Sequence, residues 1–255
     1  VGDSNVGPKT WDVKPDTVYD VPRNSDGTAI IADPRNDQTL IILQMHVAFQ
    51  MFHNALVDLM RKNGIPRSAV FESARRLARW HYQWMVTHQF LPAIVGQTLS
   101  DSVYKEVPTG APKITIKYYK PTNPAGRAFI PVEFAVAAYR FGHSITRPRY
   151  TVRDVFDSTN ALLGSVAGVP LFQETPSDNN LNGHRDLVPV PRLKIQWSKF
   201  FNADPANPTA RPVRQFDASL ADPLFHLPTT ALPDSNTLGL LSQRNLRRGR
   251  KMGLP

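Results

Sequence analysis

The chain has 255 residues, enough to bury one sizeable core or two small ones, and its apolar and charged shares, 41% and 20%, exclude wholesale disorder. A net charge of +9 would attract phosphate, anionic membrane surfaces or anionic cofactor groups without choosing among them. The sequence has no cysteine, which excludes internal disulfides, thiolate metal sites and cysteine nucleophiles. No stretch approaches about 20 uninterrupted apolar residues, so no membrane span is expected, and the first residues lack the pattern of a signal peptide.

Two long helices are predicted in the first half of the chain. Residues 1–32, rich in Pro, Gly, Asp and Asn, are expected to form an irregular arm. Asp33 then caps a helix over residues 34–60, which begins with a proline and is apolar almost all round, as in a helix central to a core. A second helix is predicted from about residue 68 to 91, where Pro92 would stop it.

The middle of the chain is predicted to be mostly irregular. The alternating run ITIKYY, within residues 101–130, permits a short hairpin. A third helix is expected over residues 131–144, with three alanines. Residues 150–235 are loop-rich, with amphipathic stretches at 152–163 and 193–201.

A last helix is predicted near the C-terminus, from a Ser/Asn cap at residues 235–236 to Gly253 and Pro255. Together these elements predict one domain with a mainly α fold, long irregular connections and little β-structure.

The run FAVAAYRFGHS carries the sharpest functional signal, with His143 near its end. By itself, a histidine on an apolar helix is more often a hydrogen-bonded core residue than a metal ligand. Here the small residues of the same helix leave room for a flat group. Arg140, one turn before His143, could reach an anionic edge of that group while the imidazole binds its metal. The run therefore favours a planar metal cofactor.

Other candidate ligands and patches have plainer interpretations. Four histidines form two pairs seven residues apart, a spacing that repeats a helix face. No HExxH motif or carboxylate cluster accompanies them, so we interpret them as core or helix-contact residues: His46, His53, His81 and His88. A basic run near the C-terminus could be a solvated face, or could meet nucleic acid or an anionic surface: Arg244, Arg247, Arg248, Arg250 and Lys251.

Four blocks of the sequence carry a resemblance to a known family. Residues 20–54 contain DPRND and a helix ending in FHN, and residues 71–96 end in FLPAIVG. Residues 134–144 read FAVAAYRFGHS, and residues 240–255 end in NLRRGRKMGLP. In this order, the blocks resemble the animal-type haem peroxidases, the superfamily of myeloperoxidase, peroxinectin and cyclooxygenase, and in particular its bacterial members.

The resemblance implies a role for each matched residue. His143 becomes the proximal axial ligand of a haem b iron, and the side-chain oxygen of Asn245 accepts the N–H of its imidazole. Arg140 and Arg248 pair with the haem propionates, because a forked guanidinium suits a carboxylate better than lysine does. Arg35 becomes the distal arginine, whose charge stabilises negative charge that develops as the O–O bond of the peroxide breaks.

Two residues of the first block depart from the mammalian pattern. Arg35, Gln38 and Thr39 are expected on one helical face. Gln38 stands where mammalian members have a glutamate esterified to a haem methyl, and Thr39 where some have a methionine sulfonium link. Neither side chain can form these bonds, so we expect a haem without them. Considered without the resemblance, Arg35 would be a helix-start arginine paired with Asp33 or Asp37.

Parts of the family's domain have no counterpart in this sequence. Residues 1–32 contain no histidine, whereas the family's distal histidine, next to a calcium ligand, precedes the arginine block. The helices beyond the RGR block are missing, and Lys251 and Met252 replace an acidic residue and a histidine. We therefore expect residues 1–255 to be a central part of one peroxidase domain. A second chain could carry the distal histidine, and any calcium would be held by residues outside this chain.

The implied function is a haem peroxidase, which reduces hydrogen peroxide and oxidises small organic donors or halides through a ferryl intermediate. Kinship also implies a secreted or extracellular protein. Two alternatives stay open. A fatty-acid dioxygenase of the same superfamily needs a radical-forming tyrosine three positions before the proximal histidine, where this chain has Arg140, and Tyr139 would point about 100° away around the helix. A non-enzymatic basic protein would bind an anionic surface without haem, and nucleic acid is disfavoured as its partner.

Overall fold

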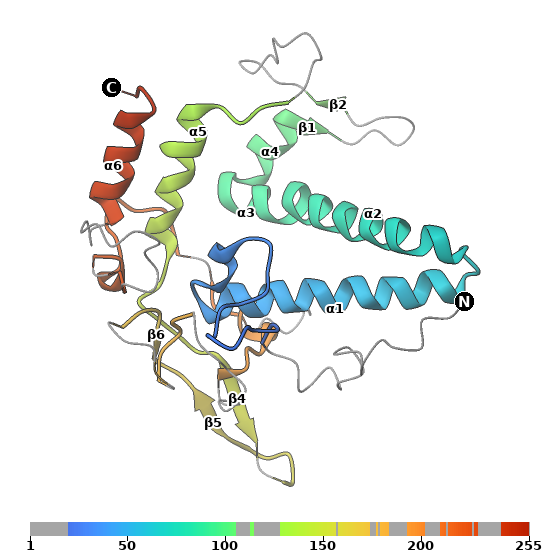
Figure 1. Cartoon of the computed structure of the whole chain (residues 1–255). Helices are drawn as coiled ribbons and strands as arrows, with labels where there is room; N and C mark the ends of the chain where they lie inside the picture. The colour runs from blue at the N-terminus through green and yellow to red at the C-terminus, as the bar shows by residue number, and fades with distance from the viewer. Residues whose placement is uncertain are drawn as a thin grey trace. The chain divides into compact units, whose positions relative to one another are not determined.

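Helices form most of the regular structure of the chain (Figure 1), which confirms the mainly α fold class. The computed structural model describes residues 20–105, 113–114, 128–156, 158–173, 177, 179–183, 193–201, 210–212, 214–225, 227–228 and 241–254. The chain divides into two compact units, one of Val1–Ala48 with Ile130–Pro255 and one of Phe49–Phe129. The interpretation of residues 1–255 as one partial domain stays a prediction.

The helical elements are η2 (Pro34–Asp37), α1 (Leu40–Lys62), α2 (Arg67–Met85), η3 (Val86–Phe90), α3 (Leu91–Val95), α4 (Gln97–Val103), α5 (Val132–Val136), η4 (Ala138–Ile145), η6 (Trp197–Lys199), η7 (Asp222–Leu224) and α6 (Leu241–Lys251). The strands are β1 (Tyr104–Lys105), β2 (Lys113–Ile114), β3 (Arg149–Tyr150), β4 (Arg153–Phe156), β5 (Leu162–Val166) and β6 (Val169–Pro170). They pair as antiparallel two-stranded sheets, β1 with β2, β3 with β6 and β4 with β5.

The start of the first long helix differs from the prediction. Asp33 caps it as expected, because its Oδ1 accepts a hydrogen bond of 3.0 Å from the N–H of Arg35. The turn that follows, η2, is 3-10 helical and ends at Gln38. Thr39 then pairs with Asn182 in an isolated β-bridge before α1 begins. Residues i and i+3 eclipse in a 3-10 turn, so Arg35 and Gln38 share a side, but the prediction that Thr39 lies on the same helical face is wrong.

Residues 181–183 cause this break. The carbonyl of Leu181 accepts the N–H of Leu40, and the N–H of Gly183 donates to the carbonyl of Gln38, each over 3.0 Å. A Cβ built on Gly183 would lie 1.7 Å from the carbonyl oxygen of Asp37, so this approach requires glycine. Hydrogen bonds to a distant segment thus replace those of a continuous helix.

The first turns of α1 lie in the core of their unit. Leu40 is fully buried, and Gln44 is only 5% exposed. Nε2 of Gln44 donates to the carbonyl of Leu193 over 3.0 Å, and its Oε1 accepts the N–H of Ile195 over 2.7 Å. One buried amide therefore satisfies two backbone groups. The amphipathic stretch expected at 193–201 contains only the 3-10 turn η6.

The amphipathic stretch expected at 152–163 belongs to a β-hairpin. It forms β4 and the start of β5, with Asp154 opposite Ser165. Asn160 has a φ of 65° in the connecting turn, a conformation that asparagine tolerates better than most residues. Val152, just before β4, is fully buried.

The helix predicted over residues 131–144 is interrupted. α5 ends at Val136, Ala137 takes φ −122° and ψ −77°, and η4 continues past His143 as a 3-10 helix. Such a break leaves carbonyl groups without helical partners. Nε of Arg140 donates to the carbonyl of Ala135 over 3.1 Å and satisfies one of them.

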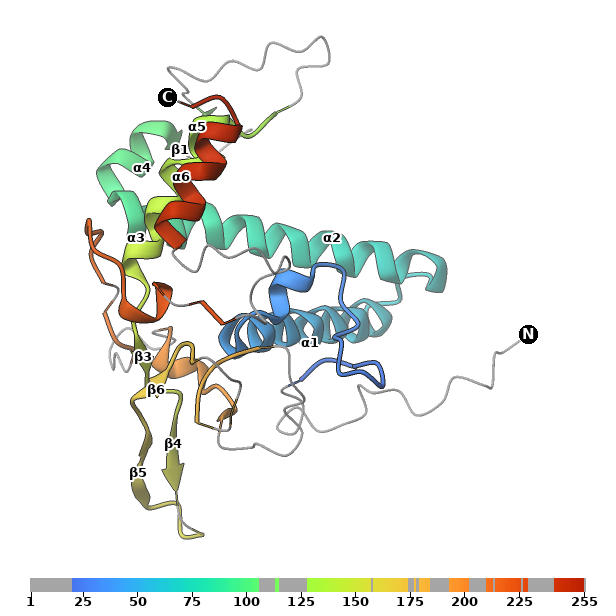
Figure 2. The ribbon, with the colours of Figure 1, turned by 60° about the vertical axis from the view of Figure 1, so that its left-hand side comes forward.

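The last helix, α6, ends where Gly253 predicts. Gly253 has a φ of 83°, and its N–H donates to the carbonyl of Arg250 over 3.1 Å. The N–H of Leu254 donates to the carbonyl of Gly249 over 3.1 Å, which completes a Schellman motif. α6 lies beside α5 (Figure 2). The Ser/Asn cap expected at 235–236 lies outside the described residues.

In the second unit, α2 returns alongside the part of α1 that starts at Phe49 (Figure 1). Three edge-to-face ring pairs, with centroids 5.2 to 5.4 Å apart, join the two helices: Phe49 with Tyr82, Phe52 with His81, and His53 with Phe71. The connection turns at Gly64, whose φ of 74° is easy for glycine.

The prediction that Pro92 ends the second helix is wrong. α2 runs into the π-helical turn η3 and then into α3, which contains Pro92 and ends at Val95, just before Gly96. A proline lacks an N–H, and its ring clashes with the preceding turn of an α-helix. A π turn is wider, and here it lies just before the proline, where it relieves that clash.

The hairpin expected within residues 101–130 corresponds to β1 and β2, where Tyr104 lies opposite Ile114. The rest of ITIKYY lies outside the described residues.

Within the described residues, α1 is long and apolar enough to cross a membrane by length and composition alone. A core helix has the same composition, and Leu40, Leu43 and Val47 are buried within the first unit. The expectation of no membrane span stays a prediction.

Candidate functional site

His143 and Asn245 lie side by side, although 102 positions separate them in the chain. The amide nitrogen of Asn245 is 3.1 Å from Nδ1 of His143. His143 belongs to η4 and Asn245 to α6, which runs beside α5 (Figure 2). The structure thus brings together two residues that the resemblance pairs, whereas their roles at a haem stay predictions.

The surroundings of His143 favour its neutral form. Its pKa is lowered, first because the half-buried ring loses hydration and then because Arg140 and Arg248 lie near. A neutral imidazole has one N–H and one lone pair. A turn of the Asn245 amide by about 180° exchanges its nitrogen and oxygen at unchanged shape, so Asn245 can accept the N–H of Nδ1. The lone pair then lies on Nε2, as a metal ligand requires.

Arginines gather around His143. The pKa of Arg140 is lowered by its burial, then by Arg248, and also by Arg35, while Tyr139 acts in the opposite direction. In the part of the chain that the structure describes, no carboxylate forms an ion pair with Arg140 or Arg248. An anionic ligand would relieve the repulsion within this cluster.

Arg35 has an exposed side chain that pairs with Asp33. Its Nε lies 2.9 Å from Oδ1 of Asp33, and its Nη2 lies 2.6 Å from Oδ2. These bonds lower the pKa of the Asp33 carboxyl to about 2. The plainer interpretation of Arg35 was a helix-start arginine paired with Asp33, and the structure confirms this contact. The distal-arginine role stays a prediction.

Gln38 follows in the same turn as Arg35. Its side chain is half-buried, and its backbone N–H donates to the backbone carbonyl of Arg35 over 3.3 Å. The structure therefore places Gln38 next to Arg35, as the sequence predicts, even though Thr39 leaves the turn.

A buried ion-pair network supports this turn, and the sequence analysis missed it. Arg23 binds both oxygens of Asp37, at 2.8 and 2.9 Å, and both oxygens of Asp20, at 3.0 and 2.9 Å. Each of these side chains is at most 8% exposed. Burial opposes the charge of Arg23, but the hydrogen bonds to Asp37 and Asp20 raise its pKa. The sequence offered one hint of this network: Asp20 and Arg23 lie inside the matched block, in a segment expected to be irregular.

Exposed apolar side chains lie near His143 along η4 and next to Asn245 in α6. Tyr139, Phe141 and Leu246 are 58%, 53% and 75% exposed, and a Cβ built on Gly142 would meet nothing within 4 Å. A neutral imidazole with arginines nearby suits a metal-containing group with an anionic edge, and exposed apolar side chains suit the flat apolar faces of such a group. The residues of this site therefore fit a haem.

The four histidines that the sequence pairs seven residues apart contact neighbouring side chains, as expected for helix-contact residues. His53 and His81 contact aromatic rings across α1 and α2, and His88 stacks on Trp84 with centroids 4.7 Å apart. Nδ1 of His46 lies 3.3 Å from the amide nitrogen of Asn36. Within the described residues, no three His, Asp or Glu side chains form a group that could hold a metal ion.

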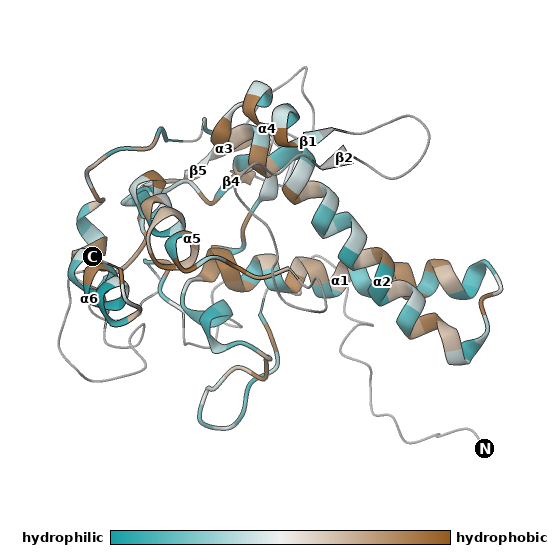
Figure 3. Cartoon of the chain, turned by 90° about the horizontal axis from the view of Figure 1, so that it is seen from above, coloured by the Kyte–Doolittle hydropathy of each residue, from teal (hydrophilic) through white to brown (hydrophobic). Residues whose placement is uncertain are grey.

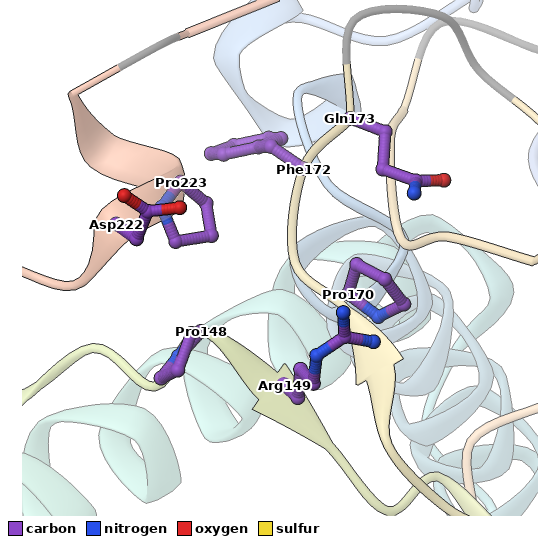
Figure 4. Close-up of a pocket in the computed structure, with 7 residues that line it drawn as sticks. All are labelled: Pro148, Arg149, Pro170, Phe172, Gln173, Asp222 and Pro223. Atoms are coloured by element: carbon purple, nitrogen blue, oxygen red, sulfur yellow. The ribbon is translucent and has the colours of Figure 1, made fainter.

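A cavity of about 280 Å³ opens elsewhere in the first unit (Figure 4). It lies between β3, β6 and η7, and it is lined by Pro148, Arg149, Pro170, Phe172, Gln173, Asp222 and Pro223. None of these residues was predicted to belong to the site.

The chain is similar to known peroxidases over most of its length. The family model of the animal haem peroxidases matches residues 7–255. A peroxidase-like protein of Margaritifera margaritifera is 25% identical over 232 residues, which cover 88% of this chain and 26% of the relative. A chorion peroxidase of Drosophila melanogaster is 24% identical over 225 residues, which cover 87% of this chain and 24% of the relative.

The chain thus spans about a quarter of the length of these curated relatives. The match to the family model includes every residue of the site described above, from Arg35 to Arg248. The chain therefore belongs to the animal haem peroxidase family.

Proposed function

We propose that the chain forms the haem-binding core of a peroxidase, with Nε2 of His143 as the ligand of the haem iron. The contact of Asn245 with Nδ1 of this imidazole carries the proposal. A hydrogen bond at Nδ1 fixes the tautomer of the imidazole and makes Nε2 a stronger metal ligand. The lowered pKa of His143 supports the same assignment, because only the neutral ring can bind a metal.

Arg140 and Arg248 would hold the propionates of the haem. Both act on the pKa of His143, so both lie near the ring that would bind the iron. A propionate beside Arg140 would offset the repulsion that Arg248 and Arg35 now exert on it. The guanidinium fork also matches a carboxylate with two parallel hydrogen bonds.

Arg35 would stabilise the peroxide as it reacts. Haem, when bound, supplies the two-electron reduction of hydrogen peroxide and regains electrons from small organic donors or halides. Arg35 would hold a fixed positive charge against the negative charge that develops as the O–O bond breaks. Asp33 occupies the N–H of Nε and one N–H of Nη2 in Arg35, so Nη1 and the second N–H of Nη2 are the donors that would face the peroxide.

A base must take the peroxide proton, and we propose that a histidine outside residues 1–255 does so, on a second chain or a further segment. Such assistance contributes typically about 10² to 10⁴ in rate. Calcium, if the whole protein binds it, would be held outside this chain as well. Because one relative is named for the chorion, an extracellular layer, we also propose that the protein is extracellular.

Haem reconstitution tests the ligand. The purified chain, supplemented with haem, is expected to develop a Soret band, and His143→Gly is expected to lose it. Added imidazole should restore the band in His143→Gly, because the free ligand can fill the space that the side chain leaves. A wild-type chain without a Soret band, or a band that His143→Gly retains without imidazole, would overturn the proposal.

A second variant separates haem binding from peroxide chemistry. Arg35→Ala should keep the Soret band, since the proposed ligand is untouched, and should react with peroxide at least about 100-fold more slowly. Equal peroxide rates in Arg35→Ala and the wild type would remove Arg35 from the proposed mechanism and leave the haem ligand unaffected.

A further inference from the structure

We propose that the exposed face of α2 binds the surface of membranes that contain anionic phospholipids. This face, named here the α2 face, consists of Arg75, Arg76 and Arg79 with the flanking indoles of Trp80 and Trp84. The proposal concerns the second unit alone and does not depend on haem binding.

The side of α2 that packs against α1 leaves these residues outward. Val70 and Ala74 are buried and mark the packed side. At about 100° per residue, Arg76 and Arg79 lie on the side of the helix opposite Ala74, and Arg75 lies about a quarter turn from Ala74, with all three side chains exposed. Figure 3 shows hydrophilic and hydrophobic segments alternating along α2. The arginines therefore face solvent while the helix stays anchored by its other side.

Positive charge strongly predominates on the α2 face. α2 contains Arg67, Arg75, Arg76 and Arg79 but only one acidic residue, Glu72. Glu72 pairs with Arg75 over 2.6 Å, with both side chains more than half exposed. Among the described residues, no carboxylate forms an ion pair with Arg76 or Arg79. Charge complementarity therefore selects an anionic partner.

The arginines surround a hollow large enough for an anionic headgroup. Its volume is about 390 Å³, and it is lined by Ala69, Glu72, Ser73, Arg75, Arg76 and Arg79. Phosphate oxygens in this hollow would accept hydrogen bonds from several guanidinium groups at once.

The exposed indoles suit a lipid surface, whereas a polysaccharide would find only one open face on each ring. Trp80 and Trp84 are 56% and 51% exposed, as in side chains that lie at the headgroup level of a bilayer. A sugar ring would have to stack on an indole face. The guanidinium of Arg76 lies 5.4 Å from the centroid of Trp80, and the ring of His88 stacks on Trp84 at 4.7 Å, so one face of each indole is already covered. Insertion at an interface leaves these stacks intact.

Binding to vesicles tests the proposal with the full chain. Vesicles of phosphatidylcholine with 30% phosphatidylglycerol should bind the chain, and vesicles of phosphatidylcholine alone should not. The variant R75Q/R76Q/R79Q should bind roughly 100-fold more weakly, since each cation near an anionic surface contributes about a factor of five. Raising the salt concentration should weaken wild-type binding in the same direction.

A matched control separates this face from the general charge of the chain. The variant R244Q/R247Q/R250Q removes three positive charges from α6, as many as R75Q/R76Q/R79Q removes from α2. It should weaken vesicle binding only through the lower net charge of the chain, by a few-fold at most. Equal losses in the two triple variants would overturn the proposal. Binding to a soluble sulfated polysaccharide that depends on the α2 arginines, with no binding to vesicles, would overturn it as well.

Two further measurements keep the test decisive if a triple variant fails to fold. Glu72→Gln removes the one acidic residue of α2 and should raise vesicle affinity about fivefold. Brominated phospholipids should quench tryptophan emission in the wild type and much less in W80F/W84F, which keeps Trp11 and Trp197. An unchanged affinity in Glu72→Gln, or equal quenching in both proteins, would contradict the proposed orientation of α2.

Discussion

The side-chain amide of Asn245 lies 3.1 Å from Nδ1 of His143 and links α6 to the 3-10 turn that carries the histidine. We predict that Asn245→Ala lowers the affinity for haem about 10- to 100-fold, as loss of such a partner typically does at metal-bound histidines. The rate at which haem transfers to an excess of apoglobin measures this change. Gln243→Ala, an exposed position on the same helix, is the control and should transfer haem at the wild-type rate.

The lowered pKa of His143 predicts a stability that depends on pH even without haem. Burial is the main cause, followed by Arg140 and Arg248, whereas the unfolded chain has the ordinary value of about 6.5. The folded state therefore holds fewer protons than the unfolded state. The stability due to neutral His143 is complete above about pH 6.5 and is lost as the pH falls through the folded pKa.

The urea midpoint of the haem-free chain measures this effect. It should fall more steeply between about pH 7.5 and pH 5 in the wild type than in His143→Gln, which does not titrate in this range. Parallel midpoint curves for the two proteins would contradict the prediction.

Arg248 is predicted to act in opposite directions with and without haem. It lowers the pKa of Arg140 by repulsion, so Arg248→Gln should raise the thermal midpoint of the haem-free chain. The same change removes a proposed propionate partner and should weaken haem binding roughly tenfold. Calorimetry and a haem titration on the same preparation give both values. Arg247→Gln, one position away, is the charge-matched control.

The sequence predicts the helices of this fold better than their interruptions. A capped start and a nearly continuous apolar run locate α1, apolar periodicity locates α2, and Gly253 marks the end of α6. The predicted first helix is interrupted at Thr39 because the backbone around it bonds to residues 181–183, more than 140 positions away. Pro92 stays within a helix because a π turn precedes it. Hydrogen bonds to distant segments and local changes of helix type cannot be recognised from a sequence window of a few helical turns.

The sequence likewise predicts one contact of the candidate site and misses another. The proximity of His143 and Asn245 follows from matching two motifs to a family, since no local pattern pairs residues so far apart. Arg23 was missed because one of its two carboxylate partners, Asp37, is 14 positions away, a separation that follows no helical or strand spacing. Its importance depends on burial, which only the folded chain reveals.

Gln38 and Thr39 predict that the haem is not covalently attached at these positions. A glutamine amide has no carboxylate to form an ester, and a threonine has no thioether to form a sulfonium. Acid acetone should therefore extract the haem from the reconstituted chain, and the remaining protein should have no Soret absorbance. Retention of haem in the protein fraction would reveal a bond to another residue.

Gly183 should tolerate no side chain, because the turn that carries Arg35 depends on its close approach. A Cβ at Gly183 would lie 1.7 Å from the carbonyl oxygen of Asp37, and the N–H of Gly183 bonds to the carbonyl of Gln38. We predict that Gly183→Ala destabilises the chain by about 1–3 kcal/mol or more, measured by urea unfolding. Gly142→Ala is the control, because an added Cβ there meets nothing within 4 Å and should cost nothing in the haem-free chain. Equal midpoints for Gly183→Ala and the wild type would mean that residues 181–183 do not hold the Arg35 turn.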